Sequence, residues 1–491
     1  MAARRDLLII GGGRLVTVLL SLVTIRAVTT LLTPEQYGQL ALLIVVQIFC
    51  GLFLVNPIGQ HINRHTHEWW DEGSLFSRLS AYKKYIFLVS IIGGFAAIAV
   101  STKLSALHTT LIVLAMLLMV NGGTWNATWI PLLNMVGQRG AAISWALVTS
   151  AVGLLVSVVL CIFWPTATNW FIGQAIGFTL GALGAFWSLR HSDLPQQNEK
   201  KQPLVTRQTI TTYCLPLAVG TGFMWLQLSG YRLVVEHYWG LSLLGFLSVG
   251  LSLASQIWGL AESLAQQFLY PFFYRRIAVT DSGLLGDAAS SEALSDLLNV
   301  LMPVYVVLIG VTFLGAPYLL KVLVAPQYAN AEVFVRLGIV IEFCRVTANV
   351  LSNAAQVTKK TRSIILPYAA GALVIFIILI IVGQRHLEIS SVAISLVFGA
   401  LLMLSIMWGL MLKQVKFHPD FKIWFIALMT MLMFIVSSYW LPKPSGWFEI
   451  ILILLVDGLV GLGLLMILLK RSDALQRLQA VNLNTKSKEA V

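Results

Sequence analysis

Charged residues are scarce in this chain, and their scarcity excludes an ordinary soluble domain. Only 11% of the 491 residues are Asp, Glu, Lys or Arg, whereas 58% are hydrophobic. A typical soluble domain has about 25% charged residues. The composition therefore predicts an all-α polytopic membrane protein.

Cysteine is also scarce, and its four occurrences carry no motif. Each one falls inside an apolar segment, with no CxxC pair and no Cys/His grouping. This pattern excludes a disulfide framework and a structural zinc site, so we expect neither a metal nor another cofactor. The N-terminus lacks the small-residue cleavage site of a signal peptide, and we expect the first apolar segment to be retained.

Basic residues exceed acidic ones, but their distribution does not indicate nucleic-acid binding. The net charge is +12, and the Lys and Arg residues lie in short segments between apolar runs. If the N-terminus is cytoplasmic, 24 of the 33 basic residues fall on the inner side, four on the outer side and five inside apolar segments. Cytoplasmic loops carry such an excess, so both termini are predicted to be cytoplasmic.

Apolar runs long enough to cross a bilayer follow one another along the whole chain. A helix needs roughly 20 apolar residues to span the hydrocarbon core. About fourteen such spans are predicted, at residues 7–32, 38–58, 82–101, 108–133, 142–164, 169–189, 209–236, 242–268, 297–323, 331–357, 364–384, 390–412, 423–441 and 447–469.

The connections between these spans are short on the outer side and reach about twenty residues on the inner side. We therefore expect no separately folding domain outside the membrane and no enzyme. A membrane glycan polymerase or ligase would need a sizeable outer loop with acidic, His or Arg residues. The Pro- and Gln-rich inner segment 191–208 is predicted to be a linker.

A weak internal repeat relates the two sides of this linker. An offset of 207 residues aligns Gly38 with Gly245, and Arg26 and Arg232 precede these glycines by 12 and 13 residues. An even number of spans separates the copies, which predicts two parallel six-helix repeats with a substrate cavity between them. The expected domains are an N-terminal lobe (1–190), the linker (191–208), a C-terminal lobe (209–413) and two extra helices with a basic tail (414–491).

Arginines inside the apolar segments require a partner or a wet cavity, because an unpaired charge in lipid is costly. Arg14 shares a helix face with Thr17, Ser21 and Thr24. This face either lines a cavity or packs on a neighbouring helix while Arg14 reaches the membrane surface. Arg26 lies near the outer end of the same segment, where reaching the surface is an equally good account.

The other intramembrane charges allow pairing as well as function. Arg232 either pairs with Glu236, four residues on, or faces a cavity. Pairing along one helix is the simplest account of Glu332 with Arg336 and of Glu342 with Arg345. Glu262 and Asp457 have no partner nearby in the sequence. We interpret Glu262, Glu342 and Asp457 as candidates for carrying a coupling proton, with pairing across helices as the alternative.

A histidine cluster, His61, His65 and His67, lies in the predicted first inner loop beside Trp69. Metal binding is one interpretation. No second cluster completes a site, so an interfacial loop is the simpler one.

Several segments between residues 1 and 365 together resemble a known family. "RAVTTLLTPEQYGQLALL" followed by "NPIGQHINRH" resembles the opening of Wzx-type polysaccharide-repeat flippases of the multidrug/oligosaccharidyl-lipid/polysaccharide (MOP) exporter superfamily. "SGYRLVVEHYWGLSLLGFLSVG", "LAQQFLYPFFYRR" and "VLVAPQYANAEVFVRLGIVIEF" extend the resemblance. One departure is Tyr231, which stands where many members carry an Asp before the arginine.

The resemblance implies a V-shaped, MATE-like two-lobed bundle that alternates between inward and outward openings. Its substrate would be an undecaprenyl-pyrophosphate-linked oligosaccharide, held in a cationic cavity with Arg14, Arg26, Arg64 and Arg232 as candidate ligands. Guanidinium groups suit such phosphate contacts.

The implied location is the bacterial inner membrane, and the implied partners are membrane lipid, a polysaccharide polymerase and chain-length proteins. A MATE-like small-molecule exporter is the main alternative, although cationic drugs would favour acidic cavity residues. A membrane polymerase or ligase and a structural scaffold are weaker ones.

Overall fold

The computed structural model of this protein describes residues 2–101, 106–191, 207–281, 286–358, 360–441 and 446–478. Within these ranges the regular secondary structure is helical, with no strand. The chain divides into two compact units, residues 1–248 and 249–491. The two units are described one at a time, and the division into lobes 1–190 and 209–413 stays a prediction.

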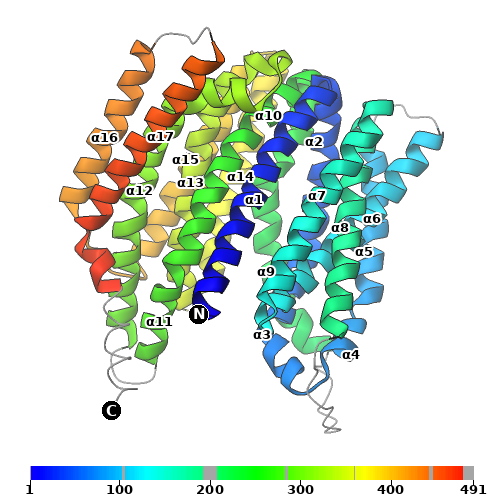
Figure 1. Cartoon of the computed structure of the whole chain (residues 1–491), viewed down its shortest axis with the longest axis horizontal. Helices are drawn as coiled ribbons and strands as arrows, with labels where there is room; N and C mark the ends of the chain where they lie inside the picture. The colour runs from blue at the N-terminus through cyan, green and yellow to red at the C-terminus, as the bar shows by residue number, and fades with distance from the viewer. Residues whose placement is uncertain are drawn as a thin grey trace. The chain divides into compact units, whose positions relative to one another are not determined.

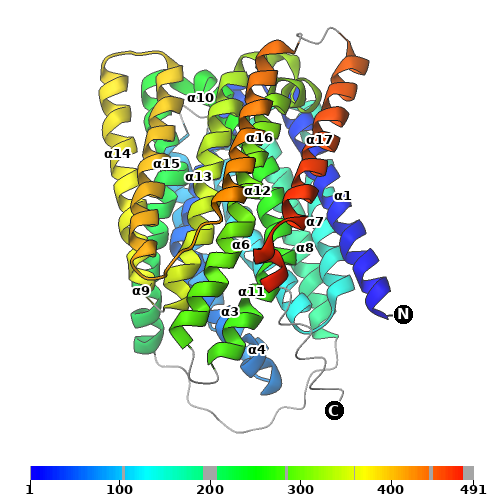
Figure 2. The same cartoon turned by 90° about the vertical axis from the view of Figure 1, so that its left-hand side faces the viewer.

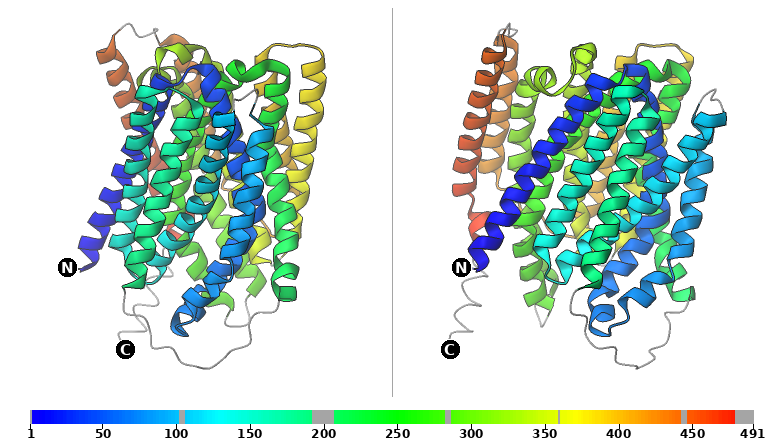
Figure 3. Two further views of the ribbon diagram at one scale, coloured as in Figure 1. Left: turned by 90° about the vertical axis from the view of Figure 1, so that its right-hand side faces the viewer. Right: turned by 45° about the vertical axis from the view of Figure 1, so that its right-hand side comes forward.

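Unit 1 is a bundle of long helices in which α7 packs along α8 and α8 packs along α6 (Figures 1 and 3). Its elements are α1 (Ala2–Leu31), α2 (Pro34–Ile48), the π-helix η1 (Phe49–Val55), α3 (Asn56–Asp71), α4 (Leu75–Ser80), α5 (Lys83–Ala99), α6 (Ala106–Met135), α7 (Arg139–Phe163), α8 (Ala167–Arg190), α9 (Arg207–Trp225), the π-helix η2 (Leu226–Gly230) and the first part of α10 (Tyr231–Phe268).

Unit 2 is built around α12, on which α13, α16 and α17 pack (Figure 2). Its elements are the second part of α10, then α11 (Tyr270–Asp281), α12 (Gly286–Leu323), the 3-10 helix η3 (Pro326–Ala331), α13 (Glu332–Val357), the 3-10 helix η4 (Thr361–Ile364), α14 (Ile365–Gln384), α15 (Ile389–Leu412), α16 (Phe421–Trp440) and α17 (Trp447–Lys470).

Among the described residues, eleven helices are long and apolar enough to cross a membrane. Three of the fourteen predicted spans account for the difference. In the first, only Val16–Leu31 qualifies, as a shorter apolar helix. The seventh and eighth are counted together as Leu217–Phe268, although Gly240, with a φ of 80°, divides this segment into two helices. The remaining difference is the tenth predicted span, α13, which carries four charged residues. The predicted fold class, an all-α polytopic membrane protein, is confirmed.

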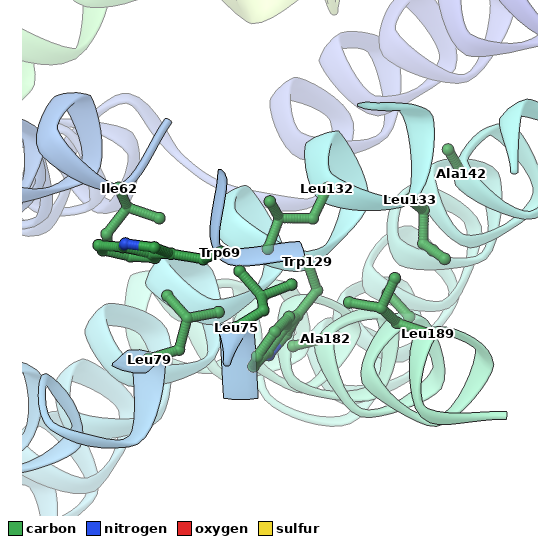
Figure 4. Close-up of a cluster of buried hydrophobic side chains, with 11 residues drawn as sticks. Ile62, Trp69, Leu75, Leu79, Trp129, Leu132, Leu133, Ala142, Ala182 and Leu189 are labelled. Atoms are coloured by element: carbon green, nitrogen blue, oxygen red, sulfur yellow. The ribbon is translucent and has the colours of Figure 1, made fainter. Parts of the chain in front are cut away.

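The segment expected to be the first inner loop is helical instead, because it has an apolar face to bury. Helix α3 continues to Asp71, and α4 follows after a short turn. Trp69 of α3 and Leu75 of α4 pack in a buried cluster with Trp129 of α6 (Figure 4). The loop interpretation missed this cluster because the buried residues are separated by His, Glu and Arg.

The first turns of two helices in unit 1 pack with their backbones in direct contact. Helix α2 starts at Pro34, and within α10 a regular helix restarts at Leu241 after Gly240, which has a φ of 80°. A Cβ added to Gly38 would overlap the carbonyl oxygen of Leu241, and a Cβ added to Gly245 would overlap that of Pro34. Adding the repeat offset of 207 residues to Pro34 and Gly38 gives Leu241 and Gly245, so the two contacts are equivalent positions of the repeat. The two segments therefore cross symmetrically, and only glycine fits at the crossing.

Candidate functional site

A polar pocket of about 380 Å³ lies within unit 1, between η1, α3 and α6. Amide and hydroxyl groups supply its polar lining, and glycine and apolar side chains supply most of the rest. Such neutral donors and acceptors match the hydroxyl groups of a sugar. The polar lining residues are Gln47, Asn56, Asn63, Thr124 and Thr128.

The π-helix η1 forms one wall of this pocket. The N–H group of Asn56 donates to the carbonyl of Gly51, five residues earlier, which is the π-helical pattern. Pro57 has no N–H, so the carbonyl four residues before it cannot receive an α-helical bond and the backbone widens. π-Helical segments occur frequently at functional sites. The sequence analysis missed this wall, although "NP" inside an apolar run was a signal for it.

The structure distributes the predicted arginines over three helices of unit 1. Arg14 lies on α1 and Arg64 on α3, directly after the pocket residue Asn63, but the side chains of both arginines are outside the part that the structure describes. Arg26 is half-buried on α1. A shared cationic cavity therefore stays a prediction.

Arg232 is half-buried at the start of α10. Its guanidinium lies over the ring of Tyr231, with the Cζ atom 5.1 Å from the ring centroid. Its Nε atom is buried and has no hydrogen-bond partner among the described residues. Within that part of the chain, the expected pair with Glu236 is not formed. Pairing with Glu236, one of the two alternatives for Arg232, is therefore wrong, and the Nε–H group has no acceptor among the described residues.

The carboxylates Glu262 and Glu342 meet at one arginine in unit 2. Arg345 bonds Glu342 on its own helix, α13, with an N–O distance of 2.7 Å, and Glu262 on α10 with one of 2.9 Å. Asn349 also donates to Glu262, at 2.7 Å. The predicted pair of Glu342 with Arg345 is confirmed, as is the pair of Glu332 with Arg336 at 3.0 Å. Glu262 pairs across helices, which was the alternative to an unpaired coupling group.

Tyrosine and asparagine side chains continue this network toward α11. Asn353 donates to the hydroxyl of Tyr270 and accepts a bond from the hydroxyl of Tyr274, both at 3.2 Å. Burial raises the pKa of Tyr270 to about 12, so this group stays a neutral phenol near pH 7. The network joins α10, α11 and α13 through groups that are nearly all satisfied.

Asp457, the third coupling candidate, lies buried in the middle of α17. Its Oδ1 atom has no hydrogen-bond partner among the described residues. It faces Gly315 on α12, where an added Cβ would lie 3.1 Å from Oδ2. Of the three candidates, Asp457 is the one that no ion pair among the described residues holds.

His65 on α3 contacts other residues of its own helix. His65 donates from Nδ1 to the carbonyl oxygen of His61 at 2.9 Å, and its ring stacks on Trp69. The described residues contain no group of three or more His, Cys, Asp or Glu side chains that could hold a metal ion. The side chain of His67 lies outside the described part.

Fold and helix composition define this chain as a polytopic helical membrane protein, and its fold is similar to that of two solved membrane transporters. The structure of the lipid II flippase MurJ in an inward closed conformation matches it with a TM-score of 0.64, at 13% sequence identity, over 94% of this chain and 97% of MurJ. The eukaryotic MATE transporter AtDTX14 matches with a TM-score of 0.51, at 12% identity, over 89% of this chain and 98% of its own. Neither a protein-family model nor a curated protein sequence matches the chain. The likeness concerns the fold.

Proposed function

We propose that this protein flips a polyprenyl-pyrophosphate-linked oligosaccharide across the bacterial inner membrane by alternating access. The flipped lipid would serve surface polysaccharide assembly, and both chain termini would lie in the cytoplasm. The polymerase and chain-length proteins of that assembly are the proposed partners. The protein would act as a transporter and not as an enzyme.

The observation that carries this proposal is the neutral polar pocket of unit 1. Five amide and hydroxyl side chains line it, and two segments that supply them, Pro34–Asn63 and Leu107–Met135, are long and apolar enough to cross a membrane. Isolated polar groups inside a membrane are expensive and mark substrate pathways. An oligosaccharide offers many hydroxyl groups to such a lining. Arg64 follows Asn63 in the chain, and Arg14, Arg26 and Arg232 remain the other candidates for its pyrophosphate.

The likeness to MurJ supports a lipid-linked substrate. MurJ is named for flipping lipid II, and the match extends over nearly the whole of both chains. The match to the MATE transporter leaves a larger part of this chain uncovered. A MATE-like small-molecule exporter is therefore the second candidate.

The glycine crossing in unit 1 suits the rocking motion that alternating access requires. Gly38 and Gly245 belong to the two sequence repeats and lie at helix starts predicted to face outward. A close contact there would shut the outer side while the inner side is open. Asp457 is the preferred coupling carboxylate, because Glu262 and Glu342 both bond Arg345, whereas no ion pair among the described residues includes Asp457.

Reconstitution into liposomes tests the pocket. We expect Asn56→Leu combined with Asn63→Leu to lower the rate of flipping of a fluorescent polyprenyl-pyrophosphate oligosaccharide at least tenfold. Asn169→Leu, half-buried at the start of α8 and outside the pocket lining, is the control for an added leucine and should flip at the wild-type rate. Equal rates for wild type and the pocket variant would contradict the proposed site. Export of cationic dyes without lipid flipping would favour the second candidate.

A further inference from the structure

A second hollow in unit 1 is a groove of about 540 Å³ along helix α6. Helix α6 packs against both α5 and α8. It forms the floor, and α5 and α8 form the walls. The lining is mainly apolar and aromatic, and the residues that matter below are Lys83, Phe87, Leu114, Leu118, Trp129 and Leu183.

Large apolar side chains on the groove walls are exposed on the surface of unit 1. The exposed fractions are 56% for Phe87 on α5, 43% for Leu118 on α6 and 59% for Leu183 on α8. The segments that contain these helices, Leu75–Ala99, Leu107–Met135 and Ala167–Arg190, are long and apolar enough to span a membrane. A groove with such walls at membrane depth faces hydrocarbon and not water.

One end of the groove carries a positive charge. Lys83 is the first residue of α5, its side chain is exposed, and none of the ion pairs found among the described residues includes it. The loop charges predict this end to be cytoplasmic, where anionic lipids attract basic residues. Trp125 and Trp129 of the groove lining stack on each other with ring centroids 5.3 Å apart.

The length of the groove fits one chain of a lipid in a single leaflet. From Leu114 to Trp129, α6 rises about 22 Å at 1.5 Å per residue. One leaflet contributes roughly 15 Å of hydrocarbon. A chain lying along α6 from the cytoplasmic end would therefore be covered over its whole length.

We propose that this groove binds an anionic phospholipid, with one acyl chain along α6 and the headgroup phosphate at the Lys83 ammonium. The site is separate from the polar pocket, whose lining shares no residue with it. It gives the protein a preference for the lipid composition of its membrane, whatever substrate it transports.

Native mass spectrometry of the full-length protein, titrated with dioleoylphosphatidylglycerol, tests the charge. Lys83→Ala should weaken binding of one lipid about fivefold. A basic residue near an anionic lipid surface contributes about 1 kcal/mol, which corresponds to about this factor in the dissociation constant. Lys84→Ala is the matched control, because Lys84 is an exposed neighbour outside the groove lining. Equal weakening by both variants would overturn the proposal, as would equal binding of dioleoylphosphatidylcholine.

Filling the groove tests the place of the acyl chain. Leu118→Trp should abolish the lysine-dependent binding, whereas Leu155→Trp should leave it unchanged. Leu155 is 64% exposed on α7 and outside the groove, so its variant controls for an added indole. Thermal unfolding of each variant should match the wild type. Unchanged lipid binding in Leu118→Trp would refute the groove, and stronger Lys83-dependent binding of polyprenyl phosphate would show that the occupant is wrong.

Discussion

The residue with the largest expected effect on stability is Arg345. It lies between Glu262 and Glu342, and all three side chains are mostly buried. Arg345→Ala would leave two carboxylates close together without a counter-charge. We expect the free energy of unfolding in detergent to fall by about 3–5 kcal/mol. Arg385→Ala, at an exposed site after α14, should change it by less than about 0.5 kcal/mol. Similar unfolding curves for both variants would show that the pairs seen here do not hold the fold.

Asp457 is the residue at which coupling is best tested. The Asn side chain has nearly the same shape but cannot carry a proton, so Asp457→Asn removes titration and keeps the packing against Gly315. We expect the variant to flip lipid at a rate that no longer responds to a pH gradient across the liposome. An unchanged response to the gradient would exclude Asp457 as the coupling group.

At the residue scale, the sequence predicted partners on one helix better than partners on different helices. Residues three or four apart must be neighbours on a helix, so the pair of Glu342 with Arg345 could be anticipated. The bond from Arg345 to Glu262 depends on how α13 packs on α10, and spacing contains no information about that. The failed pair of Arg232 with Glu236 shows the limit of the rule, because spacing permits a contact without requiring it.

At the scale of helices, substitutions at the crossing of α2 with α10 should have the clearest effect on stability. Gly38→Ala would push the two backbones apart and lower the free energy of unfolding by about 1–3 kcal/mol. Because Gly245→Ala disturbs the same crossing, the double variant should lose less than the sum of both. Gly409→Ala on α15, where an added Cβ meets nothing, should be neutral or stabilising. Additive losses would show that the two glycines do not share one contact.

A row of side chains on α12 fixes the segment before α16 by hydrogen bonds, and this can be tested by hydrogen exchange. Ser291, Ser295 and Asn299, four residues apart, bond the backbone of alternate residues in the segment 416–420 that precedes α16. The Asn299 Oδ1 atom accepts from the N–H of Asp420 at 2.9 Å. Asn299→Ala should therefore speed hydrogen exchange at that amide at least tenfold. Ser405→Ala, which changes a bond within α15, should not affect it.

Long apolar runs made the existence of most helices predictable, because only a helix satisfies its backbone within lipid. The widened backbone of η1 was not predictable from periodicity. The pocket amides that follow it, Asn56 and Asn63, lie on α3, and the second span was predicted to end at residue 58, between them. Helices α3 and α4 were also missed, because their stability comes from contacts with α6 that the local sequence does not contain.

For the whole molecule, the repeat offset of 207 residues was the most informative feature of the sequence. It aligned Gly38 with Gly245, and the structure places each glycine against the helix start that contains the other. The fold matches that of MurJ at 13% identity, so the likeness extends to the arrangement of helices and not to the side chains of a site. The candidate site was less predictable, since its five polar residues come from α2, α3 and α6, and only the packing of these helices brings them into one pocket.

The most direct test of the proposed function is a flipping assay with purified protein in liposomes. A fluorescent polyprenyl-pyrophosphate oligosaccharide in the outer leaflet should become protected from dithionite in the presence of the wild-type protein. Protection should be lost in Asn56→Leu combined with Asn63→Leu and kept in Asn169→Leu. If protected lipid does not exceed that of protein-free liposomes, the protein is not a flippase for this class of substrate.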